Sequence, residues 1–201
     1  MNLARTPEMG WSAAAGHLSE RLNSSGHALA LRLFGAVVLA HWAEHLFQAY
    51  QVYVMLWPRA EALGALGLFY PWLVRSESLH YAYALFMLIG LWVLRKGFTG
   101  RSHTWWMVSF WIQVWHHFEH VLLLSQAITH HNLFGSPVPA SILQLWVARV
   151  ELHLFYNALV FFPMAVAMYE HVFPADRERP YTHCACAWRA HETPATSAAV
   201  S

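Results

Sequence analysis

The stretch His41-Trp42-Ala43-Glu44-His45-Leu46-Phe47-Gln48 lies inside a long apolar run from about Leu33 to Trp57. A run of this length predicts a transmembrane helix, because about 20 mostly apolar residues cross the hydrocarbon of a bilayer. Positions i, i+3, i+4 and i+7 share one face of a helix. The polar residues of the stretch therefore form a single stripe: His41, Glu44, His45 and Gln48. Polar groups are costly in hydrocarbon, so this stripe must face protein, pair internally or bind a ligand.

The same pattern recurs further along the chain as His116-His117-Phe118-Glu119-His120. Imidazole together with carboxylate forms a ligand set for iron, zinc or manganese. His117 falls one position off the stripe, and we expect it to hydrogen-bond a neighbouring helix instead. Two His-x-x-Glu-His motifs in apolar segments thus predict one shared metal site, with His41, Glu44, His45, His116, Glu119 and His120 as ligands.

The composition indicates a membrane protein. Of the 201 residues, 57% are hydrophobic and 11% are charged, whereas about 25% charged residues is usual in soluble domains. The net charge of +1 argues against nucleic acid as a partner. The two cysteines, Cys184 and Cys186, are too close in sequence to indicate a disulfide framework. The N-terminal residues lack the pattern of a signal peptide.

Breaks in the apolar pattern divide the chain into three parts. Residues 1–28 are predicted to be a cytoplasmic arm, residues 29–174 a transmembrane domain, and residues 175–201 a disordered cytoplasmic tail. Four spans are predicted in the domain, at about 33–57, 79–94, 103–128 and 141–173, with Ser141 as the N-cap of the last span. The apolar segment 63–74 is too short to cross and is predicted to be interfacial or re-entrant. The fold class is therefore all-α, an antiparallel bundle of four transmembrane helices.

The distribution of lysine and arginine predicts the orientation. Basic residues precede the first span, separate the second from the third, and follow the fourth, whereas the loop between the third and fourth spans has none. The positive-inside rule then predicts a multi-pass protein of the cell membrane with both termini in the cytoplasm.

Depth along the spans adds three candidate ligands: His80, Glu151 and His153. With this orientation, all four spans carry ligand-type residues between the midplane and the outer third of the membrane. Glu151 and His153 are two positions apart and point to nearly opposite sides of a helix. We interpret Glu151 as the inward group, because it would supply a carboxylate, while His153 stays a candidate.

Two further groups of potential metal ligands are interpreted as having no metal-binding role. His130 and His131 lie in a loop, where solvated side chains are expected. The tail carries His183, Cys184, Cys186 and His191, which offer thiolate and imidazole ligands for zinc or copper(I). Their spacing matches no standard zinc pattern, so the tail is interpreted as unstructured.

The histidine spacings in the two motifs resemble the clusters of integral-membrane desaturases and hydroxylases. The resemblance covers only these two short stretches. The third cluster of that family, His-x-x-His-His, does not occur in this sequence, and glutamates are not part of the family pattern. The chain is therefore not assigned to it.

These observations predict an integral-membrane metalloprotein with a mono- or dinuclear non-haem site for a transition metal, iron being preferred over zinc or copper. The expected activity is oxidoreductase chemistry on an apolar small molecule that enters from the lipid bilayer, with a redox partner or other membrane-complex subunits as further partners. Two alternatives stay open: a haem b electron carrier, in which histidines on facing helices supply axial ligands, and a non-enzymatic subunit for metal binding or transport.

Overall fold

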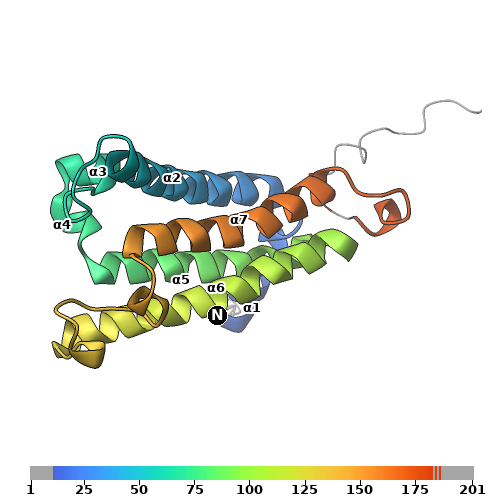
Figure 1. Cartoon of the computed structure of the whole chain (residues 1–201). Helices are drawn as coiled ribbons and strands as arrows, with labels where there is room; N and C mark the ends of the chain where they lie inside the picture. Colours follow the sequence, from blue (N-terminus) through green and yellow to red (C-terminus); the bar gives the residue numbers. More distant parts are fainter. Residues whose placement is uncertain (1–10, 183, 185, 187–201) are drawn as a thin grey trace, which may run out of the picture.

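The computed structural model describes residues 11–182, 184 and 186, and these residues form helices and loops without a β-strand. Four long helices run alongside one another (Figure 1). Their bounds are His27–Tyr53 (α2), Glu77–Leu94 (α5), Gly100–Thr129 (α6) and Arg149–Val172 (α7). The shorter helices are Trp11–Leu22 (α1), Gly64–Phe69 (α3) and Pro71–Val74 (α4), with 3₁₀ turns at Arg95–Gly97 (η1), Leu133–Gly135 (η2), Leu143–Leu145 (η3) and Arg179–Tyr181 (η4).

Three of the helical segments are long and apolar enough to span a membrane: His27–Tyr53, Glu77–Gly97 and Arg149–Val172. The all-helical class and a membrane location are therefore supported. Helix α6 has 30 residues, about 45 Å at 1.5 Å per residue, so its length suffices. Its buried face, however, carries serine, glutamine, histidine and glutamate, and it does not reach the same apolarity.

Large hydrophobic side chains are packed at the end of the helices where α2 begins. Trp106 is fully buried there, and its indole Nε1 donates a hydrogen bond to the Leu91 carbonyl at 2.7 Å. Phe98 stacks on Trp106 with ring centroids 4.1 Å apart. Away from this core, many large apolar residues of the long helices are exposed, as expected for helices that contact lipid.

Helix bounds differ from the sequence expectations at both ends of the first span and at the start of the last span. Helix α2 ends at Tyr53 rather than at residue 57, because Leu56 has a φ of 57° and the backbone has already left the helix. Helix α7 begins at Arg149, so Ser141 is not its N-cap. Residues 140–143 are held outside the helix by side chains of α6: Gln126 binds the backbone of Ala140, and Glu119 accepts from Leu143 N.

Within the described residues, parts of both terminal segments are folded. Residues 1–28 were expected to be a loose arm, but α1 lies within them, and Asn23 ties it to α5 and η1 through Val93 O and Gly97 N. The tail was expected to be disordered from residue 175, but it contains η4, and Cys184 is buried. His183 and His191 lie outside the described residues.

Candidate metal centres

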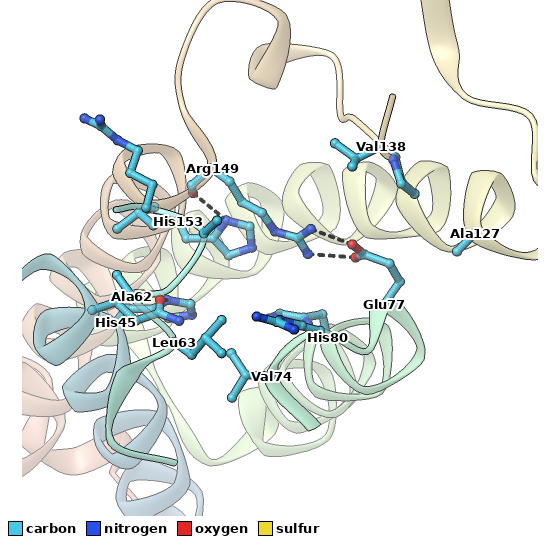
Figure 2. A pocket seen from close by; sticks show the side chains of 16 residues that line it. His45, Ala62, Leu63, Val74, Glu77, His80, Ala127, Val138, Arg149 and His153 are labelled. Carbon is cyan, nitrogen blue, oxygen red and sulfur yellow. Dashed lines mark hydrogen bonds and ion pairs between the residues drawn. The ribbon is translucent and has the colours of Figure 1, made fainter. Parts of the chain in front are cut away.

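Six histidines from four helices converge between the long helices. They are His41 and His45 of α2, His80 of α5, His116 and His120 of α6, and His153 of α7. The ring centroid of His153 lies 5.2 Å from His45 and 5.5 Å from His120, and the His80 and His153 centroids are 6.0 Å apart. Figure 2 shows His45, His80 and His153 facing one another across a cavity.

Each His-x-x-Glu-His motif brings two imidazole nitrogens together at a distance suited to a shared ion. Nε2 of His41 lies 3.1 Å from Nε2 of His45, and Nε2 of His116 lies 3.2 Å from Nε2 of His120. Two ligands on a tetrahedral ion with metal–nitrogen bonds of about 2.0–2.1 Å are roughly 3.3 Å apart. Both pairs therefore have the spacing of a chelating pair.

Hydrogen bonds fix the tautomer of three of these histidines. Nδ1 of His80 lies 2.9 Å from Ser76 O, and Nδ1 of His153 lies 2.9 Å from Arg149 O. A carbonyl can only accept, so each Nδ1 carries the proton and donates, which leaves the Nε2 lone pair free. Nδ1 of His45 donates in the same way to Gln48 Oε1 at 2.7 Å. Histidines that ligate metals have such an outer partner on their second nitrogen.

One histidine has a buried lone pair that the rest of the described chain does not use. Nε2 of His153 is buried and has no hydrogen-bond partner within the described residues. A buried polar atom without a partner is uncommon in native proteins. Because four other imidazoles surround the His153 ring, those of His45, His80, His116 and His120, a cation between them would satisfy it.

The three candidate carboxylates point to other partners. Oε1 of Glu44 accepts from Leu66 N at 2.8 Å, and Oε1 of Glu119 accepts from Leu143 N at 3.2 Å. Each thus holds a connecting segment that folds back against its helix. Glu44 nevertheless lines a cavity that His41, His45 and His80 share.

Glu151 differs from the interpretation drawn from the sequence. It pairs with Arg59 at 2.6 Å and accepts from the Tyr53 hydroxyl at 2.5 Å. The hydrogen bond to Glu151 is also the main reason why the pKa of Arg59 is raised. His153, two residues later, is the group of α7 that faces the interior, with 5% of its surface exposed.

His117 also differs from the expectation that it would hydrogen-bond a neighbouring helix. It lies against Tyr81 at 5.2 Å between ring centroids, and its buried Nδ1 has no hydrogen-bond partner within the described residues.

The arrangement is duplicated. In the first half, the motif on α2 is followed by Gln51, whose side chain binds both N and O of Gly64. In the second half, the motif on α6 is followed at the same spacing by Gln126, which binds both N and O of Ala140. The glutamine and the glutamate of each motif therefore hold the connecting segment of their own half.

The second helix of each half repeats a pattern as well, His80-x-x-Tyr83 on α5 and His153-x-x-Tyr156 on α7. Tyr83 stacks on His41, with centroids 3.6 Å apart, and Tyr156 packs on His116 at 4.4 Å. In both halves the tyrosine thus contacts the first histidine of the motif. The six-histidine cluster lies where two similar helical hairpins meet.

Two cavities reach the cluster, and His45 and His80 line both of them. One, of about 630 Å³, is lined by His45, His80 and His153 together with charged residues, among them Arg59, Arg75 and Arg149. Within this cavity, Arg149 forms a bidentate ion pair with Glu77 (Figure 2). One of its two hydrogen bonds joins Nη2 of Arg149 to Oε2 of Glu77 at 2.7 Å. The other, of about 340 Å³, is largely apolar and is lined by His41, His45 and His80 with Leu66, Leu73, Leu79 and Tyr83.

A second group of ligand-type side chains lies at the other end of the helices. The potential ligand atoms of His27, His171, Cys184 and Cys186 all lie within 4.8 Å of one another, so this group could hold a metal ion. Sequence reasoning noted the two cysteines but missed both histidines, because 144 residues separate His27 from His171 and no local spacing connects them.

Comparisons of the chain with protein-family models, with curated proteins and with solved structures found no match.

Proposed function

We propose that the six-histidine cluster is an intramembrane centre for two transition-metal ions, one chelated by His41 and His45 and the other by His116 and His120. His80 and His153, which lie on the other helix of each half, would complete the ligand sets. The observation that carries the proposal is that hydrogen bonds fix which nitrogen of His45, His80 and His153 has a lone pair. Three Nδ1 atoms donate to oxygen, so the corresponding Nε2 atoms are unprotonated.

The proposed metal is redox-active, with copper tested before iron. The cluster consists of imidazoles, whereas di-iron bundles use several carboxylates on facing helices. Among divalent first-row ions, nitrogen sites bind copper most tightly. Glu44, Glu119 and Glu151 have other hydrogen-bond partners, which favours copper over the iron expected from the sequence.

The proposed activity is electron transfer to or from an apolar, lipid-soluble small molecule. The apolar cavity between α2, α3, α4 and α5 supports this substrate class, because it joins leucine side chains to His41, His45 and His80. The charged cavity, lined by Arg59, Arg75 and Arg149, supports a route for water and protons to His45 and His80. We further propose that α6 crosses the membrane with α2, α5 and α7, its polar face covered by these helices.

Haem is the weaker alternative on packing grounds. The six rings have neighbouring centroids 4.6 to 6.2 Å apart, and they fill the space that a porphyrin between two axial histidines would need. An absorption spectrum with a Soret band would reverse this preference.

Elemental analysis of detergent-purified protein tests the proposal. To exclude the other candidate site, it is done in a Cys184→Ser, Cys186→Ser background. We expect bound copper or iron in this protein, and a loss of at least half of it in His45→Ala and in His120→Ala. His117→Ala is the matched control, because His117 is adjacent in sequence but outside the cluster, and it should keep its metal. Metal-free and stable parent protein, or unchanged metal in both cluster variants, would contradict the proposal.

A further inference from the structure

The second candidate site lies at the end of the helices opposite the charged cavity. His27 is the first residue of α2, and His171 lies in the last turn of α7. His27 precedes His41 by 14 residues on the same helix, about 21 Å at 1.5 Å per residue. The group is therefore separate from the six-histidine cluster, and its role does not depend on the function proposed for that cluster.

The tautomer of His27 directs a lone pair at both sulfur atoms. Nε2 of His27 lies 3.3 Å from Leu94 O, and since a carbonyl only accepts, Nε2 carries the proton. Nδ1 is then unprotonated, and it lies 3.3 Å from Sγ of Cys184 and 3.7 Å from Sγ of Cys186. Gly97 makes room for this ring, because a Cβ at that position would come within 2.3 Å of the imidazole.

His171 is the second, independent indication of a ligand. It is 2% exposed, and neither Nδ1 nor Nε2 has a hydrogen-bond partner within the described residues. Its ring lies edge-on to His27, with centroids 5.1 Å apart. A buried imidazole with both nitrogens unpaired is unexpected unless something binds it. A metal ion held between His171, His27, Cys184 and Cys186 would provide that partner.

The four side chains match the ligand set of a closed zinc site. Two thiolates and two imidazoles bind Zn²⁺ tetrahedrally, and a site with four protein ligands and no open position is structural rather than catalytic. The sulfur atoms of Cys184 and Cys186 are in contact, as in a disulfide, and coordination uses the reduced pair. Cys184 is 3% exposed and His27 is fully buried, whereas Cys186 is half-buried, so most of the ligand groups are shielded from solvent.

We propose that His27, His171, Cys184 and Cys186 bind one Zn²⁺ ion, which fastens the C-terminal segment to the ends of α2 and α7. Zn²⁺ is preferred over copper(I) because two of the four ligands are imidazoles, and two cysteines with two histidines form a standard structural zinc set, whereas copper(I) favours soft thiolate and thioether ligands. The ion would hold the segment after α7 in place together with Glu178, which accepts from Arg101 N at 3.2 Å.

Cobalt substitution distinguishes this site from the six-histidine cluster. Co²⁺ bound to thiolates gives a sulfur-to-metal charge-transfer absorption, which a site of histidines alone lacks. In full-length protein kept under a thiol reductant, we expect one zinc ion per chain at this site and the charge-transfer absorption after exchange with Co²⁺. Cys184→Ser with Cys186→Ser should abolish the absorption, and His171→Ala should weaken binding at least tenfold. His131→Ala, an exposed loop histidine, is the matched control and should change neither.

A second measurement covers variants that fail to fold. In the wild-type protein, removal of zinc by a chelator should speed cleavage by chymotrypsin after Tyr181, which is exposed, and added Zn²⁺ should restore protection. Absence of the thiolate absorption from reduced wild-type protein would overturn the proposal. So would a cysteine pair that stays oxidised under the reductant, or equal proteolysis with and without zinc.

Discussion

At the scale of single residues, Glu119 has a hydrogen-bond partner that the sequence did not indicate. Its sequence context predicts a metal ligand, but its carboxylate accepts from Leu143 N and is 2% exposed. We therefore expect Glu119→Gln to keep the metal, because an amide oxygen can accept the same hydrogen bond. Glu119→Ala leaves a backbone N–H without its partner and should lower the free energy of unfolding by about 1–3 kcal/mol. Metal analysis and thermal unfolding of both variants measure this, and loss of metal in Glu119→Gln would restore the glutamate as a ligand.

The positions of Glu151 and His153 show why a helical pattern alone does not settle which of two side chains faces inward. Helical periodicity allows either Glu151 or His153 to face inward, since the two residues point to opposite sides of α7. The decision depends on Arg59 and Tyr53, which come from another part of the chain and pair with Glu151. A carboxylate is stabilised by a nearby cation at the protein surface, whereas a neutral imidazole is less costly to bury.

At the scale of the element, the two connecting segments depend on one glutamine each. Gln126 accepts from Leu133 N and Ala140 N and donates to Ala140 O, and Gln51 makes the equivalent pair of bonds to Gly64. We expect Gln126→Leu to speed amide hydrogen exchange in residues 133–143 at least tenfold without affecting residues 62–67, and Gln51→Leu to do the reverse. The reason is that leucine leaves these backbone groups unpaired. Ser125→Ala, an exposed neighbour on α6, is the control, and equal exchange in all variants would contradict the assignment.

The duplication was only partly visible in the sequence. The two motifs are 75 residues apart, and Gln51 and Gln126 keep that separation, but His80 and His153 are 73 residues apart. The segment that connects the two helices is two residues shorter in the second half than in the first, relative to the histidines. The separation between equivalent residues therefore changes from 75 to 73 between the first and second helix of each half. The sequence pattern therefore indicated the apolar helices and singled out the six histidines that the structure brings together. The tyrosine contacts with His41 and His116 and the glutamine contacts with the connecting segments became visible only in the three-dimensional arrangement.

At the scale of the whole molecule, the helical class and the apolar helices follow from composition and pattern. The sequence places α5 within two residues of its observed bounds, because Leu94 is followed by a charged turn, and the structure adds Ser76 as the N-cap. Residues whose neighbours are distant in sequence escaped the prediction. His27 and His171 are the clearest examples, since each becomes a candidate ligand only when α2 and α7 bring them to the same end.

The duplication also makes a prediction about the path of the chain through the membrane. If the two halves are equivalent, α2 and α6 run in the same direction, so Leu56 and Phe134 must lie on the same side. These two residues are 79% and 84% exposed, and cysteines placed there are accessible for labelling.

In a Cys184→Ser, Cys186→Ser background, we expect Leu56→Cys and Phe134→Cys to react with an impermeant thiol reagent added outside intact cells. Asp176→Cys, beyond the end of α7, should react only after the membrane is permeabilised, as the positive-inside rule predicts. Labelling of residues 134 and 176 from the same side would mean that α7 does not cross, and labelling of residues 56 and 134 from opposite sides would exclude the parallel arrangement of the two halves.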